Sequence, residues 1–154
     1  MKTTDKVRDF KKALQTRCNV NGILVIEHWG SRRSKNIMKL VSGSAVQKTI
    51  RSLYVKDRSS DESDEGFWGL TEHQIDGLQS QGHQWDVVLL VGSGERGYLG
   101  TSQQVAEGRQ GHRKWSFSKA GDYKVHEREI EGWFTRFETY DALFPLLLPP
   151  TTQN

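Results

Sequence analysis

The sequence contains a single cysteine, Cys18, in 154 residues. One cysteine cannot close a disulfide within the chain, and it cannot supply a cysteine-rich zinc site. Nothing in the sequence places a histidine beside it, as a catalytic thiol would require. We therefore expect Cys18 to be a small buried residue near the end of a helix.

Long apolar runs are missing as well. A membrane-spanning helix needs about 18 or more consecutive apolar residues, and no stretch of the sequence reaches that length. Residues 1–12 are charged and lack the apolar centre of a signal peptide. These absences predict a cytoplasmic protein with no membrane partner.

Apolar residues are scarce overall, at 34% of the chain with a mean hydropathy of −0.70. This composition indicates that some loops and both ends are not packed. The length is typical of one domain, and the sequence shows no repeat, no long linker and no second composition. It predicts a single α/β domain over residues 1–148, followed by a frayed tail at 149–154.

The pattern of apolar residues predicts alternating helices and strands. Helices are expected at 4–16, 71–81, 101–107 and after Thr139, where Pro145 should limit the last one. Strands are expected at 23–29, 37–41, 50–56, 67–70, 85–91, 98–99, 115–117 and 123–125. This order predicts an α/β (α+β) fold with a mixed central sheet flanked by helices and an irregular C-terminal third.

Two helix starts carry the same capping-box pattern, in which a threonine is followed three residues later by glutamine. The pattern occurs at Thr71 and Gln74, and again at Thr101 and Gln104. In such a box each side chain bonds the backbone amide at the other position. We expect both threonines to cap their helices.

Two further motifs have plain structural interpretations. Residues 92–97 match G-x-G-x-x-G, but the dinucleotide fingerprint needs a helix to open there, and an apparent strand follows instead. We interpret this segment as a hairpin turn. The acidic run at 61–65 lacks the spacing of a calcium loop, and we interpret it as a solvated loop.

Basic residues gather in the first half of a chain whose net charge is +3, from 22 basic and 19 acidic residues. They are Arg32, Arg33, Lys35, Lys39, Lys48, Arg51, Lys56 and Arg58. With Trp29 and Tyr54 nearby, they would suit a surface that follows nucleic-acid phosphates. An ordinary basic exterior explains the same residues, so both interpretations stay open.

Residues 50–100 resemble the second half of the restriction-endonuclease-like PD-(D/E)xK nuclease core. The strand ending in Tyr54-Val55-Lys56 is followed by an aromatic strand, a capped helix and an apolar strand. In that family a strand carrying E/Q-x-K precedes a helix and further strands, and an earlier strand carries an aspartate. Lys56 occupies the lysine position of the motif, whereas Tyr54 stands where a glutamate or glutamine belongs.

The resemblance implies a DNA-associated domain, either a metal-dependent endonuclease or a degenerate relative that only binds DNA. It implies Mg²⁺ as the cofactor, because two carboxylates hold the ion and a lysine stabilises charge on the phosphate. The implied catalytic residues are Glu27, Lys56 and Asp57, with Glu27 and Asp57 as metal ligands. The implied nucleic-acid-binding residues are Arg32, Arg33, Lys35 and Arg51.

A second hypothesis is a non-catalytic protein-interaction module. Its candidate surface is the aromatic segment at Phe67 and Trp68 with the C-terminal tryptophans Trp115 and Trp133. Tryptophans in these positions are also typical of an ordinary core. The sequence alone therefore leaves both functional classes open.

Overall fold

The computed structural model describes residues 5–26, 28–29, 32–33, 36–43, 46–58, 67–91, 95–110 and 115–148. Its centre is a six-stranded sheet with the strand order β1-β4-β5-β7-β8-β11. The strands are β1 (Leu24–Ile26), β4 (Ile37–Gly43), β5 (Lys48–Asp57), β7 (Gln84–Leu90), β8 (Gly97–Thr101) and β11 (Thr135–Phe137). Strands β5 and β7 are parallel, and the other neighbours are antiparallel. The predicted mixed central sheet is confirmed.

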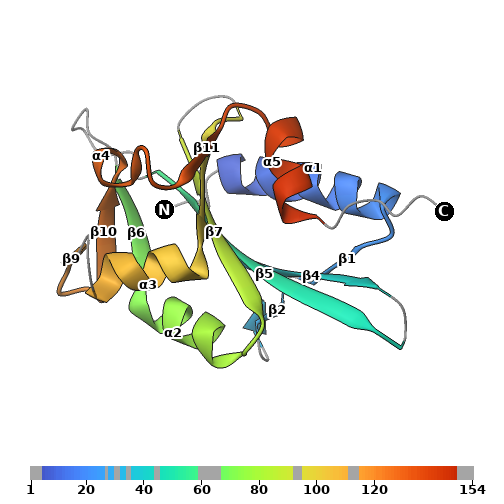
Figure 1. Ribbon diagram of the computed structural model, residues 1–154, viewed down its shortest axis with the longest axis horizontal. Helices are drawn as coiled ribbons and strands as arrows, with labels where there is room; N and C mark the ends of the chain where they lie inside the picture. The colour runs from blue at the N-terminus through green and yellow to red at the C-terminus, as the bar shows by residue number, and fades with distance from the viewer. Residues whose placement is uncertain are drawn as a thin grey trace.

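Helices cover both faces of this sheet (Figure 1). On one face lie α1 (Asp5–Val20) and α5 (Tyr140–Leu147), whose buried side chains join the first core. On the other face lie α2 (Glu72–Ser80) and α3 (Ser102–Gln110), which contribute to a second core. The flanking helices predicted from the sequence are therefore present, and among the described residues no helix is long and apolar enough to cross a membrane.

A second, three-stranded sheet packs on the second core and has the order β6-β10-β9. Its strands are β6 (Phe67–Thr71), β10 (Asp122–His126) and β9 (Ser116–Phe117). The short helix α4 (Glu127–Ile130) follows β10, and β2 (His28–Trp29) pairs separately with β3 (Arg32–Arg33). The part of the chain after α3 thus consists of short elements, with α5 the longest at 8 residues.

Strand β5 divides its side chains between the two cores. Successive residues of a strand point to opposite faces. Leu53 and Val55 accordingly join the core under α1 and α5, while Tyr54 joins the core under α2 and α3. By the same alternation, Lys56 lies on the face of Tyr54 and Asp57 lies on the face of Val55.

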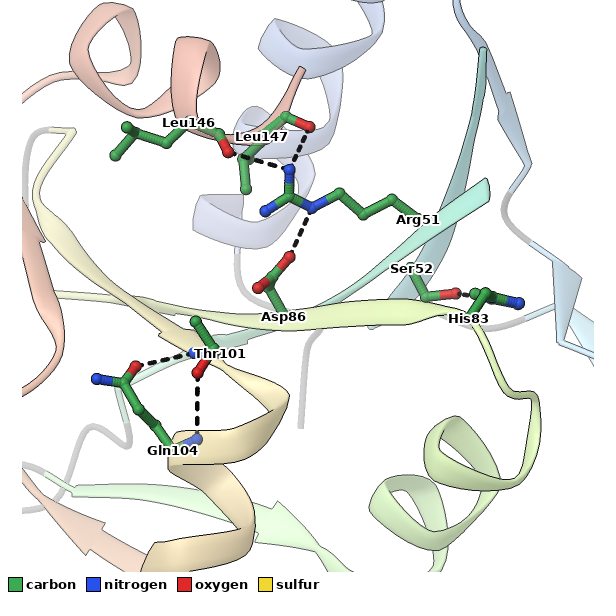
Figure 2. A network of polar contacts seen from close by, with 8 residues as sticks. All are labelled: Arg51, Ser52, His83, Asp86, Thr101, Gln104, Leu146 and Leu147. Carbon is green, nitrogen blue, oxygen red and sulfur yellow. Dashed lines mark hydrogen bonds and ion pairs between the residues drawn. The ribbon is translucent and has the colours of Figure 1, made fainter. Parts of the chain in front are cut away.

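The two capping-box patterns have different outcomes. At α3 the prediction is confirmed, because Gln104 N donates to Thr101 Oγ1 at 3.1 Å and Thr101 N donates to Gln104 Oε1 at 2.9 Å (Figure 2). At α2 the prediction is wrong, because the side chain of Thr71 makes no capping bond. Thr71 still pairs within β6, and its backbone N–H donates to the hydroxyl of Tyr54 at 3.0 Å.

Helix α1 is longer than predicted, since it ends at Val20 and not at residue 16. The extra turn brings Cys18 into the first core, where it is fully buried as expected. The chain then turns at Gly22, whose φ of 70° lies in the left-handed region that favours glycine. The burial of Cys18 therefore favours a longer helix, although the polar residues after position 16 suggested that the helix would end there.

Helix α5 shows a second correction. Thr139 caps it as predicted, with its side chain accepting from Ala142 N at 3.1 Å. Pro145, however, lies inside the helix, which continues to Leu147. An interior proline removes one backbone hydrogen bond, but Phe144 and Leu147 are buried in the first core. Their packing compensates for the missing bond.

The glycine-rich segment 92–97 joins the antiparallel strands β7 and β8, although residues 92–94 lie outside the described residues. Val91 N donates to Arg96 O at 3.0 Å, and β8 begins at Gly97. The hairpin interpretation is confirmed, since a strand and not a helix begins there. A Cβ at Gly97 would lie 2.3 Å from Leu89 O, so the close approach of the strands requires glycine.

A buried ion pair fixes α5 to the parallel strands (Figure 2). Asp86 is 1% exposed, and its Oδ2 accepts from Arg51 Nε at 2.6 Å. Arg51 Nη1 also donates to the carbonyls of Leu146 and Leu147, at 3.0 and 2.8 Å. Carbonyls at a helix C-terminus lack partners within the helix. Arg51 therefore supplies donors to the end of α5 and neutralises a buried carboxylate.

We predict that Arg51→Met lowers the free energy of unfolding by about 3–5 kcal/mol, because it leaves Asp86 buried without its counter-charge. The double variant Arg51→Met with Asp86→Leu should recover much of that loss, since no unpaired charge remains. Arg136→Met is the control, because its pair with Glu138 is exposed and should contribute less than about 1 kcal/mol. Urea unfolding measures all three, and equal losses for Arg51→Met and Arg136→Met would contradict the prediction.

Candidate functional site

Lys56 lies near the end of β5 and is half-buried. No hydrogen bond or ion pair joins its side chain to another residue in the part of the chain that the structure describes. Burial lowers the pKa of Lys56, while the negative charge of Asp122 acts in the opposite direction. A half-buried lysine without a direct partner is unusual, because buried charges are normally paired.

Asp122 reaches this place from the second sheet. It pairs with Thr71 across β10 and β6, and its Oδ2 would lie 3.3 Å from a Cβ placed on Gly69. Glycine at 69 therefore leaves the space that the carboxylate uses. The negative charge of Asp122 acts on both Tyr54 and Lys56.

Tyr54 completes a group that we call the Lys56 cluster, made of Tyr54, Lys56 and Asp122. Its hydroxyl accepts from Thr71 N at 3.0 Å, which ties β5 to β6. Burial raises the pKa of Tyr54, and Asp122 raises it further. The phenol therefore stays neutral at physiological pH. The cluster combines one cation, one carboxylate and one neutral hydroxyl.

Asp57 and Lys56, both expected at the site, do not share a face. Asp57 Oδ1 accepts from Arg58 N at 2.8 Å. Its charge acts on Tyr140 of α5, where burial first, and then Glu95, Asp9 and Asp57, raise the pKa to about 12. Asp57 thus belongs to the α1 and α5 side of β5, away from the Lys56 cluster. Its predicted metal-binding role stays a prediction, and Glu27 lies outside the described residues.

The described residues do not fit a magnesium site. Among them, no group of three or more His, Cys, Asp or Glu side chains lies close enough to hold one ion. Mg²⁺ prefers an octahedral set of oxygens that includes carboxylates. The Lys56 cluster offers one carboxylate, Asp122, and a phenol whose raised pKa keeps it from acting as an anion.

The basic residues predicted to bind nucleic acid have separate locations. Arg51 is engaged by Asp86 and the end of α5. Arg32 and Arg33 form β3, which pairs with β2, and Lys35 lies outside the described residues. Their predicted contacts with nucleic acid stay predictions, and the structure gives Arg51 a structural role as well.

Two other polar groups have structural roles. Ser52 Oγ lies 2.9 Å from His83 Nε2 (Figure 2), but Ser52 is fully buried, so a substrate would not reach it. Burial lowers the pKa of His83, and the charge of Lys39 lowers it further. Burial raises the pKa of Cys18 to about 11, so its thiol stays protonated and unreactive.

Sequence reasoning found Lys56 but missed Asp122. Residues 123–125 were predicted as a strand, and the alternation of buried and exposed residues from Asp122 to His126 supports that assignment. The local sequence does not predict that this strand pairs with β6, because the two strands are far apart in the chain. The pairing is what brings Asp122 to Lys56.

No family model matches the chain, and no curated protein matches it. Among solved structures, it is similar to Hjc, a Holliday junction resolvase from Archaeoglobus fulgidus. The match has 14% sequence identity and a TM-score of 0.47, and it covers 83% of this chain and 93% of that chain. A likeness at these values does not establish an activity for this chain.

We predict that Lys56→Met raises the melting temperature by roughly 2–4 °C, which corresponds to on the order of 1 kcal/mol in a domain of this size. The lowered pKa of Lys56 means that its charged form is disfavoured in the folded state. That cost is present at neutral pH, where the lysine is charged in both states; it shrinks as the pH rises through the lowered folded pKa and is gone above the unfolded pKa. Calorimetry measures the shift.

Lys12→Met is the matched control, because Lys12 is exposed on α1 and bears no such cost. Its melting temperature should stay near that of the unmodified protein. A lower melting temperature for Lys56→Met would show that the ammonium stabilises the fold, contrary to the prediction.

Proposed function

We propose that this chain is a nucleic-acid-binding domain of nuclease-like architecture, in which Lys56 contacts a backbone phosphate and no metal-dependent hydrolysis occurs. The observation that carries the proposal is the half-buried ammonium of Lys56, which has no ion-pair partner among the described residues. A phosphate oxygen bound at Lys56 would supply the missing partner.

The two partly buried cations of β5 support this interpretation by contrast. Arg51 and Lys56 lie on the same strand, and both are partly buried. Arg51 has a carboxylate at 2.6 Å and two carbonyl partners, so its guanidinium is paired with groups inside the fold. Among the residues that the structure describes, Lys56 has only the longer-range influence of Asp122. A charge kept without a direct partner costs stability, which a binding role would explain.

The arrangement of elements is consistent with the nuclease resemblance. A helix precedes the strands, the strand carrying Lys56 is followed by β6 and then α2, and β7 pairs parallel to β5. The residues depart from the family where chemistry is concerned, because Tyr54 replaces the expected carboxylate and Asp57 faces away. This combination supports a relative that binds nucleic acid and lacks the carboxylate expected at position 54.

We predict that the protein binds DNA with an affinity that falls steeply as salt rises, because phosphate contacts release counterions. Lys56→Met should weaken binding and reduce the slope of log K against log salt by about 1, as expected for one lost phosphate contact. Fluorescence anisotropy at several salt concentrations measures both quantities. Lys56→Met should therefore bind more weakly although it melts at a higher temperature.

Lys12→Met is again the control, since it removes one exposed charge on the far face of the sheet. Binding that does not respond to salt, or that Lys56→Met leaves unchanged, would overturn the proposal in favour of the protein-interaction module. Incubation with plasmid DNA and magnesium tests hydrolysis directly. Cleavage that Lys56→Met abolishes would overturn the non-catalytic version and establish a metal-dependent nuclease.

We also predict that DNA binding weakens as the pH rises. The loss should begin at a lower pH than it would if an exposed lysine made the phosphate contact. The pKa of Lys56 lies below its ordinary value, so its ammonium loses the proton first as pH rises. Lys56→Arg should bind without this loss, because a guanidinium stays charged throughout the range. Dissociation constants measured from about pH 7 to pH 10 test this, and parallel curves for the two proteins would contradict it.

A further inference from the structure

The three-stranded sheet has an outward face that the proposed function does not use. In its register, His126 pairs with Phe67, Lys124 with Gly69, and Asp122 with Thr71. The intervening residues, Trp68, Leu70, Tyr123 and Val125, are buried in the second core. The six paired residues therefore share the opposite face, which we call the β6–β10 face. Figure 1 shows β6 and β10 side by side, on the far side of the molecule from α1.

Aromatic and basic groups are combined on this face. The ammonium of Lys124 lies 5.3 Å from the centroid of the Phe67 ring. The ring of His126 lies 5.9 Å from the same ring, at an angle of 53°. Lys124 is exposed, and Phe67 is half-buried. A flat ring beside a mobile cation is the combination that proteins use to stack a base and hold its phosphate.

The β6–β10 face adjoins the Lys56 cluster. Asp122 belongs to both, since it lies on this face next to Gly69 and its charge acts on Lys56. Gly69 has no side chain, so no side chain projects from this position between Phe67 and Asp122. A phosphate held at Lys56 would therefore be followed by a nucleotide lying over β6 and β10.

We propose that the β6–β10 face binds an unpaired nucleotide strand, with Phe67 stacking on a base and Lys124 contacting a phosphate. This inference rests on the proposed function and specifies its substrate class. An unpaired strand is favoured because a lone ring needs the free face of a base, and bases within a duplex are already stacked on one another. The ammonium of Lys124 leaves the ring for the phosphate as the base arrives, because an exposed cation–π contact is weaker than base stacking.

The experiment compares three probes by fluorescence anisotropy: an oligothymidylate of about 12 nucleotides, an abasic oligomer of the same length, and a duplex of the same length. The abasic oligomer keeps the phosphates and removes the bases. We expect the thymidylate to bind more tightly than the other two. Phe67→Leu, which keeps apolar volume without a ring, should weaken thymidylate binding about 5- to 100-fold and leave abasic binding unchanged.

Phe117→Leu is the matched control, because Phe117 is 51% exposed on β9 but packs against Tyr123 and not on the β6–β10 face. It should leave binding of all probes unchanged. Phe67→Trp supplies a larger ring and should retain the preference for thymidylate. Circular dichroism of each variant confirms that it is folded.

Equal binding of thymidylate and abasic oligomer, or a preference for the duplex, would overturn the inference while leaving phosphate binding at Lys56 intact. A Phe67→Leu protein that keeps the full preference for thymidylate would overturn it as well. If the proposed function itself fails, no probe binds in a salt-dependent way and Lys56→Met changes nothing. The two failures are therefore distinguishable.

Discussion

The parallel pairing of β5 with β7 is the constraint on which the rest of the structure depends. Its register runs from Arg51 and Gln84 to Asp57 and Leu90. Parallel strands need a crossover between them, and here β6 and α2 provide it. Because helices and the second sheet cover both faces, the central part of β5 is buried on both sides, with Leu53 and Val55 in one core and Tyr54 in the other. A buried polar side chain on this strand therefore lowers the free energy of unfolding unless another group pairs with it.

The chain meets this constraint differently at its two partly buried cations. Arg51 is neutralised by Asp86 on the neighbouring strand and also supplies donors to the carbonyls at the end of α5, so one side chain joins three elements. Lys56 lies on the opposite face, where the hydroxyl of Tyr54 bonds Thr71 N and no carboxylate makes a direct ion pair with the lysine in the described chain. The first cation is paired inside the fold, whereas the second has no direct partner among the described residues.

The sequence was sufficient for features that depend on local pattern. The apolar run at 85–91 predicted β7, and the strand expected at 50–56 lies within β5. It was insufficient where partners are distant. Asp86 lies 35 positions from Arg51, and no local signal pairs β10 with β6, so the roles of Arg51 and Asp122 could not be predicted. Thr71 shows the same limit, because pairing within β6 and the hydroxyl of Tyr54 override its capping pattern.

The two sheets are joined in a way that fixes the environment of Lys56 before any ligand binds. Trp68 Nε1 donates to Leu90 O at 3.0 Å, and Thr71 N donates to the hydroxyl of Tyr54 at 3.0 Å. These bonds hold β6 against the ends of β7 and β5, and β6 in turn holds β10 and Asp122 in register. The distance between the carboxylate and the ammonium is therefore set by the backbone and not by a flexible loop. If Lys56 contacts a phosphate as we propose, an ammonium held this way would lose little conformational entropy on binding.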